Sequence, residues 1–272
     1  MDRTDPQCTD TLNGFKIMCC FSQPVRSVRA TNIFARAAGE NRQFLVYSMS
    51  IEARSDLAMI LPLPVKTPAG EKDVRFINLK DYSEFFRDMR MGFPILYRYG
   101  GGGGGPTSAA RSSAPLEVVQ VGDFEASFVP AVKDFARLDE RFRLPSDAWK
   151  ELPQYLSYGF AVFKLKPGAA TIHPMAFSFP RRDRKSLFFP TVHIHDGKVH
   201  SKADFDHALY CQAHPEQHLQ LGGNWEESRS HPTSFMRVDK TKGVVLANQH
   251  CYKRELHGNL PNEDTQVAVE TL

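Results

Sequence analysis

Leu57-Ala-Met-Ile-Leu-Pro-Leu-Pro-Val65 is the stretch of this sequence that decides the fold class. It is apolar at successive positions, so both faces of an extended chain would be apolar, which is typical of a strand covered on both sides. Pro62 and Pro64 cannot donate hydrogen bonds to a neighbouring strand, so the second half is expected at an edge or at the exit from a sheet. The stretch therefore predicts a buried strand in a β-rich protein.

Strand-like patterns rich in β-branched and aromatic residues continue on both sides of this run. They cover residues 17–21, 28–36, 42–52, 158–166, 172–179 and 187–195. One short helix is predicted after Asn78 or Asp81, and it should end at Gly92. A second helix is predicted from Ser201 to about His214. The expected fold is α+β and β-rich, with two antiparallel sheet units that each carry a short helix.

Composition shifts divide the chain into five segments. The low-complexity run that begins with Gly100–Gly105 is typical of a linker, and it lacks the Lys that a phosphate-binding loop needs. The prediction is a disordered tail (1–17), an N-terminal β-rich unit (18–99), a Gly/Ser-rich linker (100–115), a C-terminal β-rich unit with a helix (116–221) and a weakly structured C-terminal segment (222–272).

Charge and hydropathy exclude several classes of function. The 272 residues include 34 Lys and Arg against 31 Asp and Glu, a net charge of +3, which is too small to predict nucleic-acid binding. No apolar run is long enough to span a bilayer. The polar start, with Asp2 and Asp5, does not resemble a secretory signal, so a cytoplasmic location and free thiols are expected.

Several segments together resemble a bacterial family known as domain of unknown function 2330. They include Cys19-Cys20-Phe21, Asp56-Leu-Ala-Met-Ile-Leu-Pro-Leu-Pro64, Tyr158–Gly168 and His173-Pro-Met-Ala-Phe177. The resemblance covers roughly residues 18 to 195 and implies a β-rich fold with no known activity. This chain departs from the family pattern at the Gly-Gly pair, which is Cys20-Phe21 here, and in lacking the export signal typical of the family. No functional residue is carried over.

A possible metal site is the most specific chemical feature. His193 and His195 are two residues apart on a predicted strand, so they would share one face. On the predicted helix, His207 and Cys211 are four residues apart, a spacing that allows both to bind one metal ion. These four residues suit Zn, Fe or Cu. Alternatively, the same pattern describes an amphipathic helix and a strand with one polar face, both without metal.

Cys19 and Cys20 are candidates for a nucleophile. If processing removed the residues before one of them, its free amine would act as the base, as in N-terminal nucleophile hydrolases. A Cys20–His173 pair is another way to activate the thiol. The alternative is a buried, inert cysteine.

The basic stretch Pro180-Arg-Arg-Asp-Arg-Lys185 is predicted to be a turn between strands. It would contact a phosphate or an acidic partner, or it would simply be a solvated hairpin tip. No spacing in the chain specifies a catalytic constellation. The sequence therefore favours a β-rich binding or interaction protein with a protein partner, and a metal-dependent enzyme and a Cys-nucleophile hydrolase are the alternatives.

Overall fold

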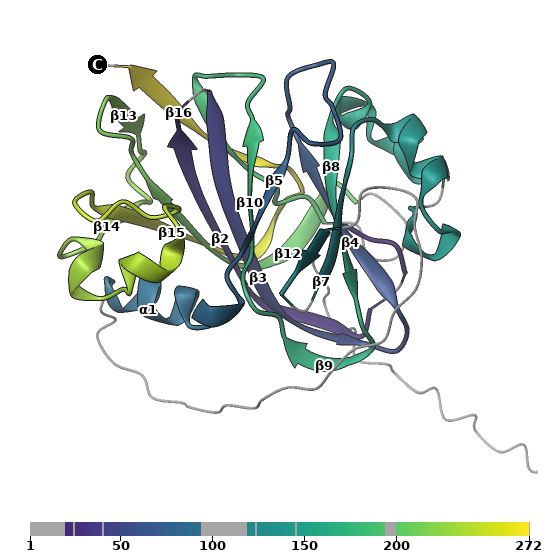
Figure 1. The fold of residues 1–272 in the computed structure, drawn as a ribbon, viewed down its shortest axis with the longest axis horizontal. Helices are drawn as coiled ribbons and strands as arrows, with labels where there is room; N and C mark the ends of the chain where they lie inside the picture. The colour runs from purple at the N-terminus through teal and green to yellow at the C-terminus, as the bar shows by residue number, and fades with distance from the viewer. Residues whose placement is uncertain are drawn as a thin grey trace, which may run out of the picture.

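A computed structural model describes residues 20–23, 25–39, 41–93, 119–122, 124–144, 146–193 and 200–271. Within these residues the protein is β-rich, with many strands, one short α-helix and several 3-10 turns (Figure 1). This confirms the predicted β-rich α+β class. No helix in this part of the chain is both long and apolar enough to cross a membrane.

The first sheet has five strands, and every neighbouring pair is antiparallel. Its order is β1 (Cys20–Phe21), β4 (Leu57–Leu63), β8 (Gly159–Leu165), β7 (Phe124–Val129) and β6 (Val119–Val121). All seven residues of β4 are buried, as the apolar pattern predicts. Strand β1 pairs only with Met59 and Ile60, so the Pro62 end of β4 has a strand neighbour on one side only.

The second sheet has eight strands and is mostly antiparallel. Its order is β14 (Glu226–Glu227), β15 (Cys251–Pro261), β12 (Lys202–Gln212), β2 (Ser27–Ala38), β3 (Arg42–Ala53), β10 (Met175–Pro180) and β5 (Arg75–Asn78), with β9 (Gly168–Thr171) also paired to β3. Strands β12 and β2 are parallel. A third, antiparallel sheet joins β11 (Ser186–Phe189), β16 (Thr265–Thr271) and β13 (Gln217–Gln220).

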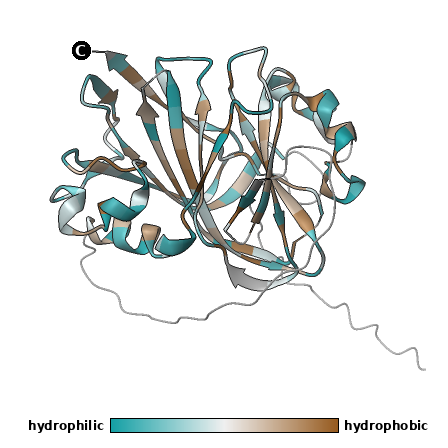
Figure 2. Ribbon diagram, in the orientation of Figure 1, coloured by the Kyte–Doolittle hydropathy of each residue, from teal (hydrophilic) through white to brown (hydrophobic). Residues whose placement is uncertain are grey.

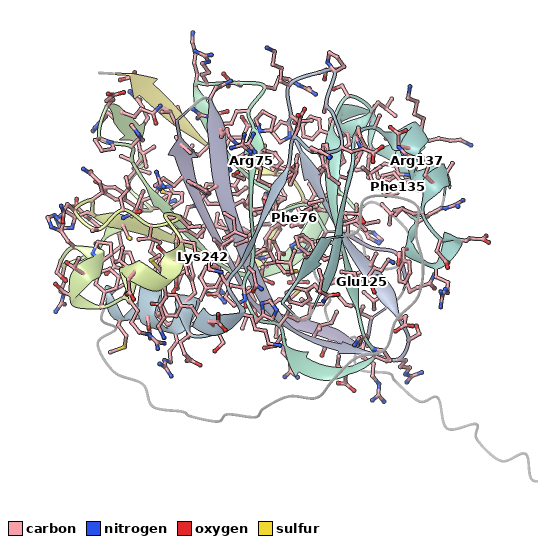
Figure 3. The ribbon with its side chains drawn as sticks, viewed as in Figure 1. Arg75, Phe76, Glu125, Phe135, Arg137 and Lys242 are labelled. Atoms are coloured by element: carbon pink, nitrogen blue, oxygen red, sulfur yellow. The ribbon has the colours of Figure 1, made fainter. Side chains whose placement is uncertain are left out.

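The main core lies between these sheets. The ring centroid of Phe76 on β5 lies 5.7 Å from that of Phe163 on β8 and 6.1 Å from that of Phe177 on β10. Aromatic side chains therefore link the two larger sheets (Figure 3). Apolar stretches run along the strands, while the connecting loops are largely hydrophilic (Figure 2). Burial of this apolar surface is the main force that holds the sheets together.

Helical elements cover the outer faces of both larger sheets. Helix α1 (Phe85–Met91) buries Phe85, Phe86 and Met89 against Phe34 and Tyr210 of the eight-stranded sheet. The 3-10 turns η2 (Val132–Arg137), η3 (Glu140–Phe142), η4 (Ser146–Glu151) and η5 (Pro153–Tyr155) belong to the core on the outer face of the five-stranded sheet. Three further 3-10 turns are η1 (Lys80–Tyr82), η6 (Pro232–Ser234) and η7 (Val238–Thr241). The first predicted helix is thus confirmed, in a shorter form.

The predicted division into two separate sheet units differs from the structure. Strands β2 and β3, from the first predicted unit, share one sheet with β10 and β12 from the second and with β15 from the C-terminal segment. The segment 222–272 is not weakly structured, because β14, β15 and β16 all lie in it. Long-range strand pairing overrides the boundaries that composition suggests. The predicted tail (1–17) and the whole of the predicted linker (100–115) lie outside the described residues.

The second predicted helix is wrong. Lys202–Gln212 is strand β12, and along it Ala203, Phe205, His207, Leu209 and Cys211 are buried while Asp204, Asp206 and Ala208 are partly exposed. This alternation has the period of two that a strand requires. The strand is further fixed by pairing on both sides, with β15 and with β2.

Candidate functional site

The structure brings together two of the four predicted metal ligands. The rings of His193 and His207 are stacked, with centroids 5.0 Å apart and planes 16° apart. Both side chains are 1% exposed, and the ring of Phe205 lies 4.3 Å from that of His193. His193 is not on a strand, because β11 ends at Phe189 and the chain continues without regular structure. His195 lies outside the described residues.

The segment that carries His193 is held by the connection between β15 and β16. Asn262 accepts a hydrogen bond from the His193 backbone N–H at 2.8 Å and donates to its carbonyl at 2.9 Å. One oxygen of Asp264 accepts from the backbone N–H groups of Thr191 and Val192, at 2.9 and 3.2 Å. These contacts fix the position of the imidazole. Sequence reasoning missed both residues, since they lie about seventy positions further along the chain and match no motif.

The folded protein favours the neutral form of the His207 imidazole. Its burial, with smaller contributions from His193 and His257, lowers its pKa well below the usual value. Among the described residues, neither of its ring nitrogens has a hydrogen-bond partner. Thr31, the residue opposite it on β2, has a buried hydroxyl that also lacks one. The surroundings of His207 therefore do not stabilise a positive charge.

Cys211 cannot bind the same metal ion as His207. Four residues along a strand span about 13 Å, whereas four residues along a helix span about 6 Å. Burial, together with nearby Cys251, also raises the pKa of the Cys211 thiol well above its usual value, which disfavours the thiolate that binds metals. Within the described ranges, no three His, Cys, Asp or Glu side chains are arranged to hold a metal ion. A metal site that includes His195 stays a prediction.

Cys20 is 3% exposed on β1, and its thiol lies 3.9 Å from the Val192 carbonyl oxygen. The proposed partner His173 contacts Phe124 of β7, with ring centroids 4.1 Å apart. Strand β7 is three strands away from β1 in the sheet, about 14 Å, so a Cys20–His173 pair is not formed. Cys19 lies outside the described residues, and its role as a nucleophile stays a prediction.

Asp264 links the two sides of this region. Besides the two backbone N–H groups, its carboxylate accepts a hydrogen bond from the Tyr155 hydroxyl at 2.6 Å. Burial raises the pKa of Asp264 to about 6, although the three donors act in the opposite direction. Burial and the adjacent Asp264 also raise the pKa of the Tyr155 phenol. The Asp264 carboxyl therefore connects Tyr155 to the backbone of Thr191 and Val192, and its pKa places its change of charge in the mildly acidic range.

The basic turn between β10 and β11 borders a small cavity. The cavity has a volume of about 120 Å³, and Gln43, Tyr158, Arg181, Arg182 and Asp183 line part of it. Two backbone hydrogen bonds fix the start of the turn. The Arg181 N–H donates to the carbonyl of Asn41, just before β3, at 2.9 Å, and the Arg182 N–H donates to that of Pro64, just after β4, at 2.8 Å.

No protein-family model matches the chain, and no curated protein does. The described fold is similar to crystal structures of baculovirus P35. One of them is 12% identical, with a TM-score of 0.48, over 89% of this chain and 96% of that one. A mutated P35 after caspase cleavage is also 12% identical, with a TM-score of 0.49, over 89% of this chain and 100% of that one. A caspase-8/P35 complex is 12% identical, with a TM-score of 0.45, over 88% of this chain and 96% of that one.

Proposed function

We propose that this protein is a binding protein that recognises an acidic segment of a protein partner through the turn Arg181–Lys185. Four of these five residues are cationic, namely Arg181, Arg182, Arg184 and Lys185. Asp183 is the only acidic residue within the turn. All except Arg181 are exposed. A concentration of one charge on an exposed turn attracts a partner of the opposite charge.

The observation that carries this proposal is that the Asp183 carboxylate is occupied by hydrogen bonds within the turn. One oxygen of Asp183 accepts from the Lys185 backbone N–H at 2.8 Å, and the other accepts from the Ser186 hydroxyl at 2.9 Å. Asp183 therefore shapes the turn and forms no ion pair with Arg184 or Lys185 among the described residues. Both cationic side chains are left available for a partner.

Neighbouring elements hold the turn in one shape. Arg182 donates to the Ser157 hydroxyl at 2.9 Å and to the Ser157 carbonyl, and its guanidinium lies over the Tyr158 ring at 5.1 Å. It also donates to the Val65 carbonyl at 3.2 Å. A contact surface that is already ordered loses less conformational entropy when it binds. This supports a recognition role better than that of a loosely held hairpin tip.

The test is a comparison of two charge-reversal variants. Arg184→Glu/Lys185→Glu changes the turn, and Arg229→Glu/Lys240→Glu makes the same change of net charge at exposed residues elsewhere. The probe is a fluorescent glutamate-rich peptide, with a glutamine-rich peptide as the neutral reference, and fluorescence anisotropy measures binding. We expect the turn variant to weaken binding about tenfold or more and the control variant to change it less than about threefold.

Equal effects of the two variants would show that only net charge matters and would refute the proposal. Equal binding of the acidic and neutral peptides to the unmodified protein would refute it as well. Raising the salt concentration should weaken binding of the acidic peptide, since the contacts are exposed charges.

A further inference from the structure

Arg181 is a buried cation without a carboxylate partner in the described part of the chain. Its side chain is 4% exposed. Asp183 influences it electrostatically but forms no ion pair with it, because its carboxylate hydrogen-bonds to Lys185 and Ser186. Burying a charge is costly unless an opposite charge or a full set of hydrogen bonds compensates it. An arginine cannot avoid this cost by losing its proton.

A second buried arginine, Arg36, shows what full compensation looks like in this protein. Its Nε, Nη1 and Nη2 donate to the carbonyls of Val244, Ala37 and Gly243 at 2.8, 3.1 and 2.6 Å. Its guanidinium also lies over the ring of Phe44. All three nitrogens of Arg36 are therefore used, and the site is structural.

Arg181 uses only one of its three nitrogens. Its Nη1 donates to the carbonyls of Arg184 and Ser186 at 3.3 and 3.2 Å. Its Nε is covered from solvent and has no hydrogen-bond partner among the described residues, and no bond from Nη2 is formed there either. Nε and Nη2 make up one edge of the planar guanidinium. This edge presents two parallel N–H groups, the arrangement that binds two oxygens of a carboxylate or a phosphate.

The cavity beside Arg181 fits a small group. Its volume of about 120 Å³ is well below that of pockets for cofactors or drug-sized ligands, which is roughly 300 Å³ or more. Gln43 and Ser186 also line it, and both already have partners: the Gln43 amide bonds to both backbone groups of Phe188, and the Ser186 hydroxyl donates to Asp183. Of the charged side chains that line the cavity, Arg182 and Asp183 use their polar atoms in hydrogen bonds, whereas Nε and Nη2 of Arg181 have no hydrogen-bond partner among the described residues.

We propose that Arg181 is the binding residue of an oxyanion site. Nη2, which is neither covered nor bonded among the described residues, donates to one oxygen of a carboxylate or phosphate group, and Nε donates to a second oxygen once the atoms that cover it in the free protein move aside. This rests on the proposed function, since the anionic group would belong to the acidic partner. Arg182 adds a second positive charge at the cavity, while its own N–H groups are used by Val65 and Ser157. Asp183 also lines the cavity and opposes an anion, so the affinity is limited by its charge.

The experiment follows the arginine Nε–H signals of the full-length, ¹⁵N-labelled protein by NMR. Inorganic phosphate and acetate are titrated separately at constant ionic strength, with chloride as the replaced anion. We expect a saturable shift of the Arg181 Nε–H signal and none for Arg36, which serves as an internal control. Arg181→Lys keeps the charge but lacks the two-pronged edge, so the saturable shift of the Gln43 amide should disappear.

Each outcome decides the proposal. Saturation with phosphate alone identifies a phosphate group, saturation with acetate alone identifies a carboxylate, and either supports the site. No saturation with either anion, an equal response at Arg36, or a saturable Gln43 shift that Arg181→Lys retains overturns it. If Arg181→Lys does not fold, the titration of the unmodified protein, with Arg36 as the internal control, still decides. The peptide assay with Arg184 and Lys185 is independent, so a failure here, with that result intact, rejects the oxyanion site alone.

Discussion

Replacing His207 with leucine should remove a large part of the protein's sensitivity to acid. The imidazole is neutral and buried in the folded state, where its pKa lies well below the usual value. In the unfolded chain it is in water and has a pKa of about 6.5. Below that pH the unfolded state therefore binds a proton that the folded state does not bind. By linkage, this proton lowers the free energy of unfolding as the pH falls.

The magnitude follows from the two pKa values. Between pH 7 and pH 5 the unfolded imidazole takes up about 0.7 of a proton, and the folded one takes up less because its pKa lies well below the usual value. The corresponding loss of stability is about 2 kcal/mol, or about 1 kcal/mol per pH unit, which is below the limiting slope of about 1.4 kcal/mol per pH unit. At pH 7 the leucine variant should be as stable as the unmodified protein or more stable, because the ring nitrogens it removes make no hydrogen bond in the described structure.

Urea unfolding at pH 7, 6 and 5, followed by tryptophan fluorescence, measures the effect. The quantity of interest is the difference between His207→Leu and the unmodified protein at each pH, because Asp264 titrates in the same range with the opposite sign. His218→Leu is the control, since that side chain is exposed on β13. The difference for His207→Leu should grow by about 2 kcal/mol from pH 7 to pH 5. A difference that stays constant, or that His218→Leu reproduces, would refute the neutral, buried state of His207.

Three other predictions follow from single contacts. Asp264→Asn removes a carboxyl whose folded pKa of about 6 exceeds its unfolded pKa. The free energy of unfolding of the unmodified protein should therefore rise by on the order of 2 kcal/mol relative to this variant as the pH falls from 7 to 4, and unfolding titrations at each pH measure the difference. Gly159→Ala would place a Cβ 2.5 Å from the Phe128 ring and should lower stability by about 1–3 kcal/mol, whereas Gly223→Ala, with open space around it, should not. In a Cys8→Ser/Cys19→Ser variant the buried thiols should react with a thiol reagent only at the rate of unfolding, and fast labelling would contradict their burial.

The sequence predicted the β-rich class because its apolar run at residues 57–65 forms strand β4, in which all seven residues are buried. It failed at β12 for a specific reason. Phe205 and Leu209 are four residues apart, a spacing that fits one face of a helix and one face of a strand equally well. The residue between them that distinguishes the two is His207, and a polar residue there favoured the helix. Its burial arises from contact with His193, which no local pattern reveals.

The candidate site was predictable only in part. The convergence of His193 and His207 is real, but it depends on Asn262 and Asp264, whose backbone contacts come from a connection far along the chain. The basic turn was visible as a run of charges. Its division into one buried and several exposed cations was not, because that depends on Asn41 and other residues that meet the turn only in the folded sheet.

The buried imidazole and the buried guanidinium face the same problem with different chemistry. Both are polar side chains with nitrogens that have no partner in the described structure. His207 becomes compatible with its surroundings by remaining neutral, so it needs no ligand. Arg181 keeps its charge at any ordinary pH, and burial only lowers its pKa from a high starting value. Of the two groups, only Arg181 gains from an added anion, which is why the binding function is assigned to the turn and not to the histidine pair.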